Sequence, residues 1–157
     1  MKSLPIFVLA ATAMLATPVI AQEAANTNME ILMQKVKADK KLLVATNMEL
    51  TDGEAKGFWP LYESYQKELA QVNQQLGNVI KEYADAYNKG PVPNDKAKKL
   101  LNDALAVEEA ELKLKRSYAE KMGKVLPATK VARYIQIENK VRAAVRFGLA
   151  AGIPLVY

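Results

Sequence analysis

The side chains that most often carry out chemistry in proteins are scarce in this chain. Its 157 residues include no histidine and no cysteine, which excludes thiol nucleophiles, Ser-His-Asp and Cys-His catalysis, the common zinc sites and disulfides. The sequence also contains no glycine-rich phosphate loop and no nucleophile elbow. We therefore predict that the protein is not an enzyme and that it carries no cofactor and no metal.

A run of carboxylates is the remaining candidate for cation binding or acid–base chemistry. Glu108, Glu109 and Glu111 follow Asp103 within a predicted helix. Consecutive residues of a helix point in different directions, so only Glu108 and Glu111 share a face. No other polar residues converge on this pair in the sequence pattern, and we expect a solvated run of charges.

Positive charge is concentrated towards the end of the chain. The whole sequence has a net charge of +5, and residues 130–147 contain five basic residues with Glu138 as the single acid. Such a segment can attract an acidic protein, nucleic acid or anionic lipid, whereas the alternative is a solvated helix face with local pairs such as Glu138 with Arg142. The candidate protein-binding cations are Arg133, Lys140, Arg142 and Arg146.

Residues 1–21 have the pattern of a secretory signal peptide. Lys2 precedes an apolar stretch over residues 4–15, and Thr17-Pro18 and Val19-Ile20-Ala21 then suit a cleavage site. The alternative is an uncleaved anchor, but the apolar run is shorter than the roughly 20 residues of a transmembrane helix. We expect a periplasmic protein that does not span a membrane once cleaved, with residues 22–157 as a single all-helical domain. Because we expect export, we expect no nucleic-acid partner.

Helix-forming residues dominate the rest of the chain, and four helices are expected. The first begins at a capping box from Thr27 to Glu30 and fades near residue 46. The second begins at another capping box, Leu50-Thr51-Asp52-Gly53-Glu54, and ends at residues 88–93, with Pro60 as a possible kink. The aromatic residues along its first turns are expected to belong to the core; they are Phe58, Trp59, Tyr62 and Tyr65.

The third and fourth helices follow the proline-rich loop at residues 90–93. We expect Asn94 or Asp95 to cap the third, which continues to about Leu126, and the fourth to run from Thr129 to about Leu149. The apolar side of the fourth is predicted to consist of Val131, Ile135, Val141, Val145 and Leu149. The second and third helices then form a long antiparallel hairpin.

Two apolar rows run along the third helix instead of one. The first row is Leu101, Leu105, Leu112, Ala119, Met122 and Leu126. The second row is Leu100, Ala104, Val107, Leu114, Tyr118 and Val125. A helix with two apolar sides must bury both or use one for binding, so we expect a homodimer and take Leu114 and Tyr118 as further candidate protein-binding residues. The apolar tail at residues 153–157 is expected to dock on the body or on the dimer partner.

The capping motif at Leu50, Thr51 and Glu54 resembles the LTxxQ motif of the Spy/CpxP-like family of periplasmic stress proteins, with glutamate in place of glutamine. The order of elements is similar across most of the chain after residue 21. Where the family has a second such motif, this chain has Leu126-Pro127-Ala128-Thr129-Lys130, without the expected threonine and glutamine. Metal-sensing members of the family use histidines, which this chain lacks.

The resemblance implies a cradle-like antiparallel dimer that holds unfolded proteins on a concave, basic and apolar surface without ATP. We therefore expect an ATP-independent chaperone or envelope-stress adaptor whose partners are unfolded or specific envelope proteins. The alternative is a sensor or inhibitory subunit that docks on the ectodomain of one membrane protein.

Overall fold

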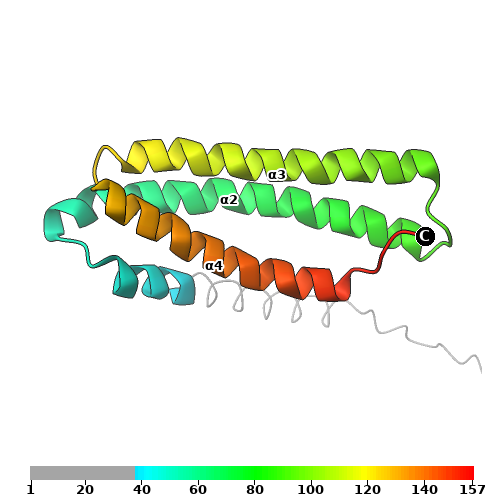
Figure 1. The fold of residues 1–157 in the computed structure, drawn as a ribbon, viewed down its shortest axis with the longest axis horizontal. Coiled ribbons are helices and arrows are strands. Elements are labelled where there is room, and N and C mark those ends of the chain that lie inside the picture. Colours follow the sequence, from blue (N-terminus) through cyan, green and yellow to red (C-terminus); the bar gives the residue numbers. More distant parts are fainter. Residues whose placement is uncertain (1–37) are drawn as a thin grey trace, which may run out of the picture. The chain divides into compact units, whose positions relative to one another are not determined.

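The computed structural model describes residues 38–157 (Figure 1). This part of the chain consists of four helical segments without a strand: residues 38–48, α2 (Asp52–Tyr87), α3 (Asn94–Met122) and α4 (Ala128–Gly152). The all-helical fold predicted from the sequence is thus confirmed. The predicted signal peptide and the capping box from Thr27 to Glu30 lie outside the described residues. Residues 38–42 are helical, and residues 43–157 form a separate compact unit, to which all that follows refers.

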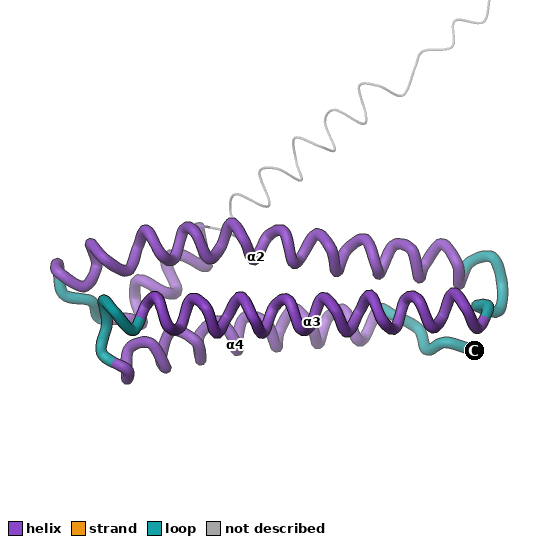
Figure 2. The backbone as a smooth tube through the Cα atoms, turned by 90° about the horizontal axis from the view of Figure 1, so that it is seen from above, coloured by secondary structure: helices purple, strands orange, loops and turns teal. Residues whose placement is uncertain are grey.

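α2 and α3 form the predicted antiparallel hairpin and pack closely along their lengths (Figures 1 and 2). Residues 88–93 make the connection, in which Gly90 has a φ of 126°. A side chain at this φ would be strained, and glycine avoids the cost because it has no Cβ. α4 runs back beside the hairpin and contacts both of its helices through side chains.

The capping box at the start of α2 is confirmed. The Thr51 hydroxyl accepts a hydrogen bond from the Glu54 backbone N–H at 3.4 Å, and the Glu54 carboxylate accepts one from the Thr51 backbone N–H at 2.8 Å. Lys130 of α4 also donates to this carboxylate, at 2.6 Å. The hydrogen bond from Lys130, followed by that from Thr51, lowers the pKa of Glu54 below its ordinary value. One carboxylate therefore caps α2 and ties it to α4.

Several predicted helix ends are corrected by the structure. α2 begins at Asp52 and continues through Pro60, so the proline does not set its start. α3 begins at Asn94 after Pro93 without a side-chain cap, so neither Asn94 nor Asp95 has the predicted capping role. It ends at Met122, one turn before Leu126, because the chain turns at residues 123–126 ahead of Pro127. α4 extends to Gly152, beyond the predicted end at Leu149.

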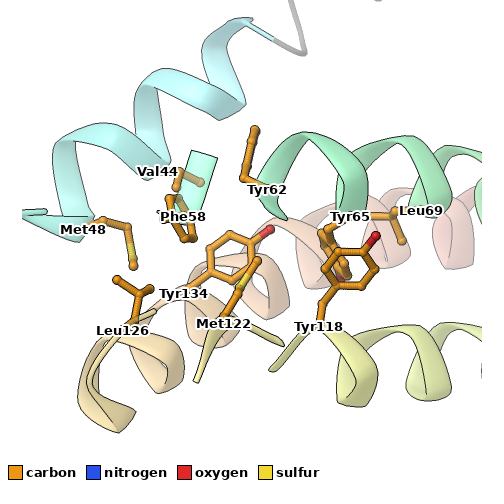
Figure 3. Close-up of a cluster of buried hydrophobic side chains, with 10 residues drawn as sticks. All are labelled: Val44, Met48, Phe58, Tyr62, Tyr65, Leu69, Tyr118, Met122, Leu126 and Tyr134. Atoms are coloured by element: carbon orange, nitrogen blue, oxygen red, sulfur yellow. The ribbon is translucent and has the colours of Figure 1, made fainter. Parts of the chain in front are cut away.

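The core gathers where the start of α2, the end of α3 and the start of α4 meet (Figure 3). The prediction that Phe58, Tyr62 and Tyr65 are core residues is confirmed, and Trp59 packs against them partly buried. Tyr134 of α4 stands edge-on to Phe58, with ring centroids 5.2 Å apart, and its ring is fully buried. The remaining buried members are Val44, Met48, Leu69, Tyr118, Met122 and Leu126.

The buried side of α4 differs from the predicted aliphatic row. Tyr134 and Glu138 are its buried residues, whereas Val145 is exposed. Gln66 of α2 donates one hydrogen bond to the Glu138 carboxylate, at 2.9 Å, and another to the Tyr134 hydroxyl, at 3.2 Å. Of the predicted row, Val131 and Ile135 pack partly buried against the core. A search for aliphatic residues alone misses the fully buried part of this side, because a tyrosine and a hydrogen-bonded glutamate form it.

Candidate protein-binding surface

The two apolar rows of α3 have different environments. The second row faces the core, with Leu100, Val107 and Tyr118 buried. The first row faces outward over most of its length: Leu101 is 60% exposed, Leu105 54% and Leu112 50%. These three leucines are four and seven positions apart, which places them along one side of the helix. We call them the leucine strip.

An open apolar groove begins on the same side of α3, two turns beyond Leu112, where Ala119 follows the line of the strip. It has a volume of about 510 Å³ and lies between the end of α3 and the start of α4. Its lining is Ala119, Gly123, Ala128, Val131, Ala132, Ile135 and Gln136. The small side chains leave room for another chain to approach the two helices closely. The leucine strip and the groove together form what we call the candidate binding surface.

Charged residues of both signs accompany the leucine strip. Lys98, Glu109, Lys113 and Arg116 are exposed and have no ion-pair partner among residues 38–157. They lie before, between and after the leucines along α3: Lys98 before Leu101, Glu109 between Leu105 and Leu112, and Lys113 and Arg116 after Leu112. Sequence reasoning missed these residues because it looked for a segment with a net charge, and this side of α3 has charges of both signs.

Three of the four predicted binding cations are paired within the fold. Arg142 donates to the Glu111 carboxylate and, at 2.6 Å, to the Asn73 side-chain oxygen. Arg146 donates to Glu111 at 3.2 Å and to Glu108 at 3.3 Å. These contacts hold α4 against α2 and α3. The basic character of α4 therefore serves packing between helices in this unit.

The other two candidate cations lie elsewhere on α4. Arg133 donates at 3.3 Å to the Glu49 carboxylate and at the same distance to the Asn47 carbonyl oxygen. Lys140 is exposed and has no ion pair with another described residue. The structure thus does not bring the four cations together beside the leucine strip, and the candidate surface rests on the apolar residues of α3.

The acidic run is not uniformly solvated, which corrects the expectation from the sequence. Glu111 is buried, and its carboxylate forms an ion pair with Lys115 at 3.7 Å in addition to those with the two arginines. Glu109, in contrast, is exposed. Burial acts to raise the pKa of Glu111, but the hydrogen bond and charge of Arg142 and the charges of Lys115 and Arg146 outweigh it and lower the pKa. Among the described residues, no three carboxylates gather closely enough to hold a metal ion.

Leu114 and Tyr118 lie on the inner side of α3. Tyr118 is only 2% exposed, and its ring lies 5.4 Å from that of Tyr65. Its hydroxyl donates to the Glu68 carboxylate at 2.5 Å, and burial, followed by that hydrogen bond, raises its pKa to about 12. Leu114 packs partly buried against the core. Tyr118 thus joins α3 to α2 and Leu114 packs against the core, so the exposed row is the one that contains the leucine strip.

The C-terminal tail docks on the far end of α2. The Tyr83 hydroxyl donates to the Pro154 carbonyl oxygen at 2.9 Å, and the rings of Tyr87 and Tyr157 meet edge to face at 5.0 Å. The prediction that this tail docks on the body is confirmed by these contacts. Leu155 nevertheless remains 88% exposed.

No helix in residues 38–157 is both long enough and apolar enough to cross a bilayer. Comparison of the chain with protein-family models, curated proteins and solved structures finds no match. The resemblance to the Spy/CpxP-like family therefore stays a prediction that rests on Leu50, Thr51 and Glu54 and on the order of the elements.

Proposed function

We propose that this chain is an exported helical protein that binds other proteins and holds unfolded chains without ATP, in the manner of the Spy/CpxP-like proteins that it resembles. The proposal includes neither catalysis nor a cofactor. The observation that carries it is the exposed row of Leu101, Leu105 and Leu112, which leads to the apolar groove beside α4. Exposed apolar surface marks sites of protein interaction, and here it is interrupted between Leu105 and Leu112 by the exposed Glu108 and Glu109.

The size of the leucine strip suits weak and reversible binding. From Leu101 to Leu112 the helix rises about 16 Å, which matches roughly five residues of extended chain. Full burial of one leucine side chain contributes about 1.5–3 kcal/mol, and these leucines are already half covered. After the entropic cost of association, little net free energy remains for each contact. A protein that must release its clients without ATP needs such modest affinity.

Exchanging the strip leucines for a polar residue of similar size tests the proposal. In the triple variant Leu101→Gln, Leu105→Gln and Leu112→Gln, we expect most of the suppression of aggregation of a denatured model protein to be lost. The three side chains are exposed, so helicity and melting temperature should change little, and circular dichroism checks both. Leu155→Gln is the matched control, because it removes an exposed leucine that lies on the tail. Full protection by the triple variant would refute the proposal.

A second candidate function, docking on one specific envelope protein, is favoured by the groove. Four of its seven lining residues are alanine or glycine, which suits the close approach of a partner helix. Recovery of one stoichiometric partner from envelope extract would support this adaptor role, and a broad set of partners would support the chaperone role.

A further inference from the structure

We propose that the outer side of α4, from Lys140 to Ala151, binds the surface of a lipid bilayer, with Phe147 in the acyl region and Lys140 among anionic headgroups. The inference goes beyond the proposed function and does not depend on it, because the leucine strip belongs to α3. It is carried by an inversion of polarity in this half of α4, where charged side chains face the protein and apolar ones face outward.

The inner side of this half of α4 is charged. Glu138, Arg142 and Arg146 are spaced four residues apart and therefore share one side of the helix. Glu138 is buried and accepts a hydrogen bond from Gln66 of α2. The two arginines pair with Glu111 of α3. These three charged residues are thus already engaged within the fold.

The outer side is apolar and exposed. It is formed by Phe147 and by four alanines that each lie three or four positions from it: Ala143, Ala144, Ala150 and Ala151. Phe147 is 79% exposed, and no charged side chain occurs from residue 147 to residue 157. A surface helix normally turns its apolar side to the core and its polar side to water. The reverse arrangement here indicates contact with an apolar partner.

The tail adds apolar surface at the same end of the bundle. Leu155 is 88% exposed and Val156 57%. Because Tyr83 of α2 holds Pro154, the tail lies at the end where α2 and α3 are joined, as does the end of α4 (Figure 1).

The properties of the outer side favour lipid over a protein partner. From residue 143 to residue 151 the helix rises about 12 Å and is about 10 Å wide. This area is far below the roughly 800 Å² that each partner contributes to a stable protein interface. The five side chains contain no hydrogen-bonding group, whereas protein interfaces have about one hydrogen bond per 100–200 Å². Binding to a lipid surface depends instead on buried apolar area and on attraction to anionic lipid.

Lys140 has the charge and the position to meet anionic headgroups. It lies three positions before Ala143 and seven before Phe147, on the same side of the helix. It is exposed and has no ion pair with another described residue. We therefore expect weak, reversible binding that is stronger on anionic than on neutral bilayers and that salt reduces.

Flotation with lipid vesicles tests the inference. The vesicles contain phosphatidylcholine alone or an equal mixture of phosphatidylcholine and phosphatidylglycerol. The protein begins at residue 22, because the apolar stretch at residues 4–15 would itself bind lipid. Phe147→Gln should weaken binding to the mixed vesicles roughly tenfold, because the aromatic ring is no longer buried in lipid. Phe147→Leu should keep most of the binding. Leu112→Gln, which removes an exposed leucine of α3, is the matched control and should bind like wild type.

A second pair of variants tests the role of Lys140. Lys140→Gln should weaken binding to the mixed vesicles roughly fivefold and leave binding to phosphatidylcholine unchanged. Lys67→Gln removes the same charge from an exposed position on α2 and should have a smaller effect. Equal losses in the two variants would show that net charge alone attracts the protein, and would overturn the placement of Lys140 at the headgroups.

The outcomes separate this inference from the proposed function. Wild-type protein that floats with neither kind of vesicle, or Phe147→Gln that floats as well as wild type, overturns the inference. If wild type ignored the vesicles and Phe147→Gln lost one protein partner from envelope extract, the outer side of α4 would belong to a protein contact instead. In the lipid-free aggregation assay Phe147→Gln should protect fully, whereas the triple variant of the leucine strip should still float with the mixed vesicles.

Discussion

At Glu111, two arginines of α4 and Lys115 of α3 converge on one buried carboxylate. Removing a charge from such a group costs more than removing a surface ion pair, because the remaining partners stay desolvated. The carboxylate belongs to the acidic run that sequence reasoning placed in solvent. The spacing within α3 places Glu111 on the core-facing row, four positions after Val107 and three before Leu114. The residues that compensate its buried charge, Arg142 and Arg146, come 31 and 35 positions later in the chain.

The lowered pKa of Glu111 predicts how the stability of the protein depends on acidity. Because the folded pKa lies below the unfolded value, the ionised carboxylate contributes stability that is fully present above the unfolded pKa of about 4.3. This contribution is lost as the pH falls through the folded pKa. Melting temperatures recorded from pH 7 to pH 2.5 should therefore fall less steeply in Glu111→Gln than in wild type, because glutamine does not titrate.

Glu109→Gln is the matched control for this pH series. Glu109 is exposed and lies two positions away on the same helix. Its replacement should therefore leave the fall in melting temperature at low pH close to that of wild type. If the melting temperature of Glu111→Gln fell at low pH as steeply as that of wild type, the role assigned to the buried carboxylate would be contradicted.

Among the elements, α2 was the best predicted from the sequence. Its start follows from a capping box that uses only residues three positions apart, and its end follows from the loop at residues 88–93. These signals involve only residues close together in the chain, so they can be recognised in a single sequence. The end of α3, set by the turn ahead of Pro127, was predicted one turn too late. On α4 the predicted Val131 and Ile135 do pack against the core, but the fully buried Tyr134 and Glu138 were missed.

The close approach between α2 and the loop after α3 can be tested at Gly57. A Cβ at this position would lie 2.9 Å from the Cβ of Val125, whereas a Cβ at Gly53 would meet nothing within 4 Å. Gly53→Ala should leave stability equal or raise it by up to about 1 kcal/mol, because alanine is the better helix former. Gly57→Ala should lower stability by about 1–2 kcal/mol, because the clash exceeds that gain.

Urea unfolding of the two alanine variants, monitored by circular dichroism, provides the comparison. The two positions are one turn apart in the same helix, so differences in propensity nearly cancel and the contact with Val125 remains. Equal stabilisation by both substitutions would show that the loop does not restrain α2 at Gly57.

For the whole molecule, composition and periodicity sufficed for the all-helical class and for the hairpin. They also predicted that α3 has two apolar rows, but the assignment of the rows required the structure. Tyr118 and Leu114 face the core, and Leu101, Leu105 and Leu112 are left outside. Both rows contain leucines at helical spacing, so only the partners of each row distinguish them.

The structure also changes the role that the sequence predicted for the basic residues of α4. Charge along the sequence predicted a cationic surface on α4, whereas Arg133, Arg142 and Arg146 pair with acids from elsewhere in the chain. A net charge counted over one segment does not include the opposite charges that folding brings to it. Binding through α3 should therefore depend chiefly on apolar contact.

Site-specific crosslinking tests binding through the leucine strip most directly. A photoreactive amino acid would be placed at position 105 in one variant and at position 67, an exposed lysine of α2, in another. Each protein would be irradiated in the presence of a denatured model protein. We predict crosslinks to the client from position 105 and few from position 67. Equal crosslinking from both positions, or none from position 105, would contradict the assignment of the strip as the binding surface.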